Sequence, residues 1–413
     1  MGLRSYIIVR ILLTIPLIML LLSIVFLIIR VIPGDPVLLH FERKASEEAV
    51  EAMRQRLGLD KSLPIQYFEY LGGLFRGDLG RSMQDFSPVS EQIFSAFPAT
   101  LELAICSMLV ATTIGILLGV KASESYNSLK DHLIRAFGII VYAMPIFFLG
   151  MIFQMIFAIN FHWLPANGRF PPRLTEPRGM ILFMNQPVGI AVWSFMIGLL
   201  CLALHVGLLR MKGVRFWGQG STISLSHFMI VWIVGFTVWI VGFSYAQLNM
   251  SGVVRVSTGL FTVDSVIEGN ILKFVESLRY LFLPSLTLGL VLSGVFIRLT
   301  RSNMLETLRL DFVTAAKARG LKESTVTYGY ALRNAFLPIL TMMGLQFATL
   351  LGGAILTETT FSWPGLGRYL VDRINFRDYT AIQGAVVYFA LIVAVVNLII
   401  DILYAYLDPR IRY

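Results

Sequence analysis

Eight apolar runs of about 20 residues constrain the fold of this 413-residue chain more than any other feature. At a rise of about 1.5 Å per residue, each run is long enough to cross a hydrocarbon core of about 30 Å as an α-helix. The runs are 7–29, 100–120, 137–161, 189–209, 225–246, 280–299, 336–356 and 382–403. The sequence therefore predicts an all-α, polytopic transmembrane helical bundle with eight spans.

The composition agrees with a membrane protein. Hydrophobic residues make up 56% of the chain, charged residues only 14%, and the mean hydropathy is +0.73. Soluble proteins carry about 25% charged residues, so a soluble enzyme, a disordered chain and a disulfide scaffold are all excluded. Cys106 and Cys201 lie inside apolar runs, where a thiol behaves as a small hydrophobe, and neither a disulfide framework nor a metal site is indicated.

The distribution of positive charge predicts the orientation. The first run is longer than the apolar region of a secretory signal and precedes no cleavage site, so we expect a retained span with a cytoplasmic N-terminus. The inside segments are then 1–10, 121–135, 210–227, 298–334 and 408–413. They hold 17 of the 34 Lys and Arg residues, and the other half is spread over longer external segments. The net charge of +9 is thus explained by cytoplasmic loops rather than by nucleic acid binding.

The external loop 31–98 contains signals for two helices. Ser46 is a suitable N-cap for a polar stretch that ends at Gly58, and 64–75 is a second candidate. We expect a small extracytoplasmic helical subdomain.

The usual signatures of catalysis are absent from the sequence. Without a Gly-Lys dipeptide there is no phosphate-binding loop G-x-x-x-x-G-K-[ST], and H-E-x-x-H, Cys-x-x-Cys and G-x-S-x-G do not occur either. The five histidines are scattered singly, and His205 is best explained by an interhelical hydrogen bond. We therefore predict a non-enzyme with no catalytic residue, no metal site and no cofactor bound by this chain.

The segment 301–334 is amphipathic and too polar to span a membrane. Within it, 311–321 is typical of a short helix that Gly320 ends, and small residues on one side permit the close approach of a partner. Phe312, Ala315, Ala316 and Arg319 fall on that side by helical spacing. The alternative is a solvated helix that only joins two spans.

This segment resembles the cytoplasmic EAA loop of ABC importer permeases of the oligopeptide/dipeptide family. Ala315, Ala316 and Gly320 stand at the motif spacing, although Thr314 replaces the acidic residue that opens the general motif. Further matching blocks are 33–36, 57–60, 76–82, 98–102, 333–338, 361–367, 377–379, Asn397 with Asp401, and 404–410. Together they cover 1–170 and 278–413.

The resemblance implies the type I permease fold in a prokaryotic plasma membrane, with both termini cytoplasmic. It implies a second homologous permease, two cytoplasmic ATPase subunits that carry ATP and Mg, an extracytoplasmic substrate-binding protein and surrounding lipid. Peptides are the expected cargo; oligosaccharides, nickel or another solute are alternatives. A secondary transporter or a membrane scaffold is the alternative of a different class.

The resemblance also implies which residues dock the ATPase and how the chain is divided. The docking residues are Asp311, Phe312, Thr314, Ala315, Ala316, Arg319, Gly320 and Leu321. The expected parts are a first helix at 1–30, the external subdomain at 31–98, the permease domain at 99–407 and the coupling loop at 301–334.

An insertion distinguishes the chain from the usual six-span members. The runs 189–209 and 225–246 form a two-helix insertion at about 175–260, and two crossings keep the coupling loop cytoplasmic. Positive charges at 210–215 fit an inside hairpin. The alternative is a hairpin that packs on the outer face without crossing.

Several residues inside the spans are candidates for packing or gating. Gly115 and Gly119 form a G-x-x-x-G pair that favours close helix packing, with a place in the substrate path as the alternative. Pro145 and Pro338 are candidate gating kinks, although proline is common in membrane helices.

Four polar residues near span ends complete the candidate set. Asn397 and Asp401 should face the bundle interior, where Asp401 either serves function or pairs with an arginine such as Arg333. Glu102 and Glu358 lie at outer span ends, where we expect interfacial solvation, with contact to substrate or binding protein as the alternative.

Overall fold

The computed structural model describes residues 3–31, 37, 46–56, 58–169 and 258–407. All regular elements in these ranges are helical, and a single isolated bridge joins Arg81 to Pro88. The predicted spans 189–209 and 225–246 lie outside the described residues, so the number of eight spans stays a prediction. The expected all-α fold is confirmed for the part of the chain that the structure describes.

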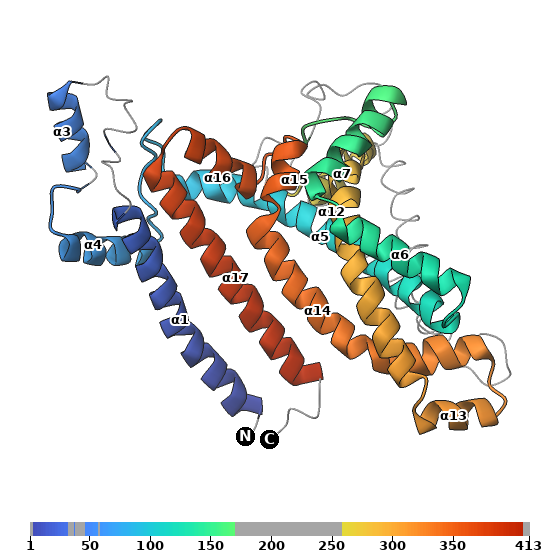
Figure 1. Ribbon diagram of the computed structural model, residues 1–413. Coiled ribbons are helices and arrows are strands. Elements are labelled where there is room, and N and C mark those ends of the chain that lie inside the picture. Colours follow the sequence, from blue (N-terminus) through green and yellow to red (C-terminus); the bar gives the residue numbers. More distant parts are fainter. Residues whose placement is uncertain (1–2, 32–36, 38–45, 57, 170–257, 408–413) are drawn as a thin grey trace. The chain divides into compact units, whose positions relative to one another are not determined.

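The order of the described helices along the chain can be followed in Figure 1. They are α1 (Leu3–Val31), α3 (Glu47–Arg56), α4 (Leu63–Phe75), α5 (Val89–Glu124), α6 (Leu129–Ala143), α7 (Ile146–Phe153), the π-helix η1 (Gln154–Asn160), α11 (Phe261–Ile267), α12 (Ile271–Thr307), α13 (Asp311–Ala318), the π-helix η2 (Thr325–Ala331), α14 (Leu332–Gly353), α15 (Ile355–Thr360), α16 (Leu366–Asn375) and α17 (Tyr379–Leu407).

Four described helices are long and apolar enough to cross a membrane. They are α5, α12, α17 and the continuous helix Thr325–Leu351 that η2 and α14 form. α5, α12 and α17 each contain one predicted run and extend beyond it, whereas the run 336–356 ends a few residues after the helix Thr325–Leu351 does. The run 7–29 lies within α1, whose apolar part Leu12–Ile28 is shorter. The described residues thus form helices at the expected places.

The run 137–161, which we expected to be one span with a candidate kink at Pro145, is broken sharply there. α6 ends at Ala143, and the axis of the following helix, Ile146–Asn160, is turned by 101°. Pro145 fixes its own φ at −59° and forces Met144 out of the helical region, to ψ 129°. The pair therefore counts as a fifth span only if a sharply bent helix is accepted.

The described residues belong to two compact units. The first comprises Met1–Arg169, Leu281–Glu306 and Ala335–Tyr413, and the second comprises Phe170–Tyr280 and Thr307–Asn334. The membrane-spanning core lies in the first unit. The second unit contains 307–334, which is most of the predicted coupling loop and is called the coupling segment below.

Glycines set the distance between α5 and α12 within the first unit. A Cβ atom at Gly115 would collide with Phe296, and one at Gly119 would lie 2.5 Å from Cβ of Thr300. At Gly289 the obstruction comes from α5, with the carbonyl oxygen of Ser107 at 2.9 Å. The backbones therefore approach as closely as these glycines permit, which is how helices gain van der Waals contact in lipid.

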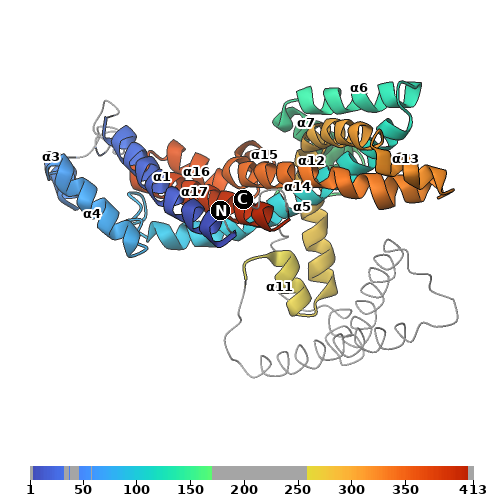
Figure 2. The same ribbon diagram turned by 90° about the horizontal axis from the view of Figure 1, so that it is seen from below.

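α6 packs against α12 by the same means (Figure 2). A Cβ atom at Gly294 would collide with the carbonyl oxygen of Gly138 and lie 2.9 Å from Cβ of Tyr142. α5, α6 and α12 thus form a closely packed three-helix block.

α1 lies along α17, although the two helices are at opposite ends of the sequence (Figures 1 and 2). Leu22 and Val25 of α1 pack with Val387 of α17 and Leu71 of α4 in one buried cluster. A hydrogen bond of 2.6 Å between Ser23 and the Tyr67 hydroxyl also joins α1 to α4. The N-terminal helices are therefore attached to the C-terminal helix.

The surroundings of Gly115 in α5 and Gly138 in α6 predict different effects of alanine on stability. Gly115→Ala should destabilise the protein by about 1–3 kcal/mol, because Phe296 has no space for the added methyl group. Gly138→Ala is the matched control, since its Cβ would meet Ile297 no closer than 3.5 Å and Ala is the better helix former. Thermal unfolding in detergent should lower the midpoint for Gly115→Ala only; equal midpoints would contradict the packing role.

Candidate functional site

The coupling segment contains a short helix with a defined stop. α13 begins at Asp311 and ends at Ala318, after which Arg319 caps it and Gly320 adopts φ +75°. The Gly320 amide donates to the Lys317 carbonyl. A Cβ atom at Gly320 would meet nothing within 4 Å, so the requirement for glycine comes from the left-handed backbone and not from a close contact.

The two sides of α13 differ in burial. Val313 and Ala316 are buried, while Asp311, Phe312, Thr314, Ala315, Arg319, Gly320 and Leu321 are exposed. The motif spacing alone suggested that Ala316 shares a side with Phe312 and Ala315, but the structure places it on the buried side. Seven of the eight predicted docking residues lie on accessible surface.

Exposed apolar side chains flank this helix. Leu310, Phe312 and Leu321 are 41%, 39% and 37% exposed. Sequence analysis missed Leu310, because it lies before the motif, and Val313, because the motif gives no indication of the inward side. The open side of α13 thus combines apolar contact area with polar groups, as a protein-binding surface requires.

Glu358 is fully buried, which corrects the expectation of interfacial solvation. Its carboxylate accepts hydrogen bonds from the Thr100 hydroxyl at 2.6 Å and from the Arg368 amide at 3.0 Å. The amide belongs to the first turn of α16, so the carboxylate caps that helix. Space for the cap comes from Gly365 and Gly367, where a Cβ atom would collide with Glu358 or approach it closely.

Glu102 is also buried, 4% exposed, and it pairs with Arg169. The guanidinium donates from Nη2 at 2.6 Å and from Nε at 3.1 Å to the same carboxylate oxygen. It also lies over the ring of Trp363, 5.6 Å from the centroid, and the Trp363 indole donates to the Ala99 carbonyl. These contacts join α5 to the segment after η1 and to the segment after α15.

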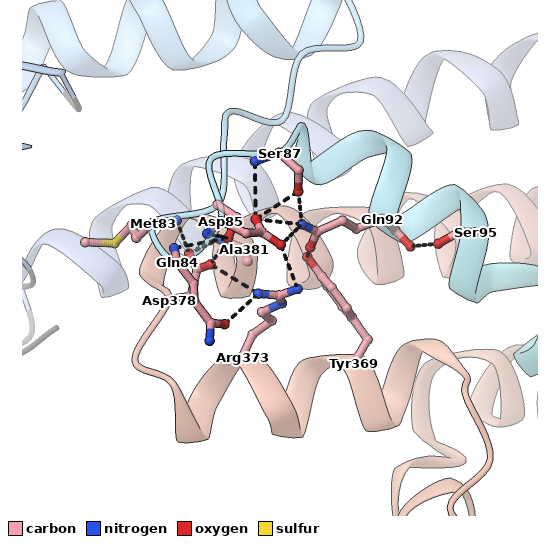
Figure 3. A network of polar contacts seen from close by, with 11 residues as sticks. Met83, Gln84, Asp85, Ser87, Gln92, Ser95, Tyr369, Arg373, Asp378 and Ala381 are labelled. Atoms are coloured by element: carbon pink, nitrogen blue, oxygen red, sulfur yellow. Dashed lines mark hydrogen bonds and ion pairs between the residues drawn. The ribbon is translucent and has the colours of Figure 1, made fainter. Parts of the chain in front are cut away.

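A second polar network lies around Asp378, at the turn between α16 and α17 (Figure 3). Its buried carboxylate accepts from the Ser82 hydroxyl at 2.6 Å and from the amides of Met83 and Ala381 at 3.1 Å. The loop that precedes α5 is therefore bound to the N-terminus of α17.

Arg373 and Tyr369 of α16 extend this network (Figure 3). Arg373 donates to Gln84 at 3.0 Å and lies 3.8 Å from Asp85. The Tyr369 hydroxyl donates to Gln92 at 2.7 Å. The loop 82–88, α5, α16 and α17 thus share one set of polar contacts.

The predicted gating residues occupy different environments. Pro145 begins α7 at the sharp bend, whereas Pro338 lies inside α14, which continues through it. Asn397 is exposed on this chain, contrary to the expectation that it faces the bundle interior, and Asp401 is half-buried. The side chain of the neighbouring Ile400 lies against α14, where a Cβ atom at Gly344 would meet it at 2.8 Å.

Comparison with known proteins identifies the family. The family described as binding-protein-dependent transport system inner membrane component matches residues 111–413, and its N-terminal counterpart matches 3–104.

Three relatives illustrate the similarity. The dipeptide transport system permease protein DppB of Alkalihalophilus pseudofirmus is 35% identical over 404 residues, with 98% of each chain covered. The di/tripeptide transport system permease protein DppB of Pseudomonas aeruginosa is 35% identical over 389 residues, with 94% of this chain and 93% of the relative covered. The glutathione transport system permease protein GsiC of Pectobacterium atrosepticum is 31% identical over 409 residues, with 99% of each covered.

Helices long enough to cross a membrane, together with these matches, define a transport protein of the membrane. The chain belongs to the family of binding-protein-dependent transport system inner membrane components. It is the permease subunit of an ABC importer and not an enzyme, which confirms the prediction from the coupling segment and its accompanying blocks.

Burial of Glu358 predicts a pH-dependent stability. Burial raises the pKa of Glu358 to about 7, and hydrogen bonds from Thr100, Arg368 and Gly367 oppose the rise only in part. Because the folded-state pKa exceeds the unfolded value of 4.5, the stabilising contribution is complete below pH 4.5 and is lost as pH rises through 7. In thermal unfolding, the midpoint of Glu358→Gln should therefore depend less on pH between 4.5 and 8 than the midpoint of the wild type does. The same pH dependence in the two proteins would contradict this.

Proposed function

We propose that the cargo of this importer is a short peptide. The proposal rests mainly on similarity over 98% of both chains to a permease named for dipeptide transport. Relatives named for di/tripeptides and for glutathione, which is itself a tripeptide, agree with it. Oligosaccharides and nickel are competing cargoes within the wider family.

We further propose the composition of the complete importer. This chain and a second homologous permease enclose the path, and two cytoplasmic ATPase subunits that bind ATP and Mg supply the energy. A binding protein delivers peptide from outside. Cytoplasmic termini are supported by the density of Lys and Arg in the segments expected inside.

In this arrangement α13 docks one ATPase subunit. Its exposed side, with Phe312, Ala315 and Arg319, is supported as the contact surface by its accessibility and mixed polarity. ATP-driven closure of the ATPase pair displaces the docked helix, and rigid helices convert this displacement into alternating access.

Purification of the tagged chain from its native membrane tests cargo and composition together. Gentle extraction should recover a second permease and ATPase subunits, and dipeptides should stimulate ATP hydrolysis in the presence of the binding protein. Nickel or oligosaccharides should leave hydrolysis at the basal rate. Recovery of the chain alone, without ATPase activity, would instead support a secondary transporter or a scaffold.

Replacement of Gly320 tests the docking role of the coupling segment. Gly320→Val should abolish ATP-linked peptide uptake while leaving membrane insertion intact, because a β-branched residue at φ +75° costs about 1–3 kcal/mol and displaces the end of α13. Gly320→Asn should retain much of the uptake, since Asn tolerates the left-handed region.

Gly329→Ala provides the matched control for Gly320. It lies in η2, where an added Cβ atom would meet only a Thr325 methyl group at 3.8 Å. Uptake by this variant should equal that of the wild type. Full uptake by Gly320→Val would refute the docking assignment.

A further inference from the structure

An ion pair joins α6 to the last turns of α12, and nothing in the sequence motifs points to it. Nε of Arg301 donates to Oδ1 of Asp131 at 2.7 Å, and Nη2 donates to Oδ2 at 2.7 Å. The Asp131 side chain is fully buried and that of Arg301 is 18% exposed. Two parallel bonds of this kind fix direction as well as distance between the two helices.

Further contacts hold the Asp131 carboxylate in place. The Asn127 amide donates to Oδ2 at 3.0 Å, and Arg135 lies 3.5 Å from Oδ1. Ser128 caps the same first turn of α6 through its hydroxyl. The Arg301 guanidinium lies over the Tyr126 ring, 5.6 Å from the centroid. The turn between α5 and α6 is therefore built around this pair.

The position of Arg301 along the chain gives the pair its significance. α12 ends at Thr307 and α13 begins at Asp311, so only 308–310 separate the two helices. This link is a hydrogen-bonded turn, in which the Leu310 amide donates to the Thr307 carbonyl at 3.1 Å. A displacement of α13 therefore reaches the end of α12 through a short connection.

α6 and α12 are held together at two levels. The close backbone approach at Gly294 and Gly138 lies inside the bundle. The Asp131–Arg301 pair lies nearer the end of α12. The ends of helices tend to fray. These two contacts together fix the last turns of α12 to α6.

We propose that Asp131 and Arg301 are positioning residues that transmit the movement of α13 to α5 and α6. The ion pair makes the end of α12 move with the three-helix block, so that displacement of α13 is not absorbed by local unwinding. The inference rests on the proposed docking function of α13. Burial of the pair agrees with a role in geometry, because buried ion pairs contribute less to stability than well-packed apolar groups do.

The test uses the complete importer, with partner permease, ATPase subunits and binding protein, in proteoliposomes. The measured quantity is dipeptide transported per ATP hydrolysed. Asp131→Asn and Arg301→Gln should lower this ratio at least about fivefold, the lower end of typical coupling between sites. Because removing one partner of a buried pair is destabilising, the ratio is measured on complex that has been purified intact, for which basal ATP hydrolysis should stay at the wild-type level.

Glu268→Gln is the matched control for the loss of an ion pair. Glu268 pairs with Lys273 at the same distance of 2.7 Å, but both side chains are partly exposed. Lys273 lies in the first turn of α12, at the end opposite to Arg301. This variant should keep the wild-type ratio. A fivefold loss in the control as well would overturn the specific role of the Asp131–Arg301 pair.

A cross-link separates transmission from charge. The double variant Asp131→Cys and Arg301→Cys is made in a chain with Cys106→Ser and Cys201→Ser. It should transport little dipeptide per ATP hydrolysed until a short thiol-reactive linker bridges the two new thiols. Restored coupling supports a fixed connection. Full coupling before cross-linking, or none after it, would overturn the proposal.

Failure of the inference is distinguishable from failure of the proposed function. If Gly320→Val transports normally, or no ATPase subunit co-purifies, the docking role itself fails. If docking holds and Asp131→Asn transports at the wild-type ratio, only the transmission role of the ion pair fails.

Discussion

Close contact between α5, α6 and α12 is the interaction on which the rest of the first unit depends. Lipid is as apolar as a leucine side chain, so helices in a membrane gain little from hydrophobic burial and associate by packing. Gly115, Gly119 and Gly294 remove the side chains that would hold these helices apart. Two buried carboxylates add polar contacts, with Asp131 in the first turn of α6 and Glu102 inside α5, each bound to an arginine. Apolar packing sets the distance between the helices, and the Asp131–Arg301 pair fixes the alignment of α6 with α12.

The sequence predicted the positions of helices better than their shape. Apolar runs are long and uninterrupted, so α5, α12, α14 and α17 were found at the expected places. Pro145 was identified as a candidate kink, but the size of the bend was not predicted, because proline is compatible with both a mild kink and a full break and the outcome depends on contacts distant in sequence. The amide of Gln154, for example, donates to the Thr360 carbonyl beyond the bend.

The structure of the coupling segment was predictable because it depends on local sequence. A short helix and a left-handed glycine at its end follow from neighbouring residues alone. The buried carboxylates were not predictable in this way. Glu358 meets Thr100 and Asp131 meets Arg301 across more than 150 residues of sequence, and an isolated acidic residue near a span end has the same pattern whether it is solvated or buried. Without the partners, burial cannot be inferred from the residue type.

The pairing of α1 with α17 has a consequence for biosynthesis. At about 5–20 residues per second, translation completes α17 on the order of tens of seconds after α1 has left the ribosome. During that interval α1 resides in the bilayer without the helix against which it finally packs. Its side chains are compatible with surrounding lipid, because Leu12, Leu17 and Leu20 are each 59% exposed even in the complete fold. The first helix is thus apolar on nearly all sides, as a segment must be that enters lipid long before its neighbour is made.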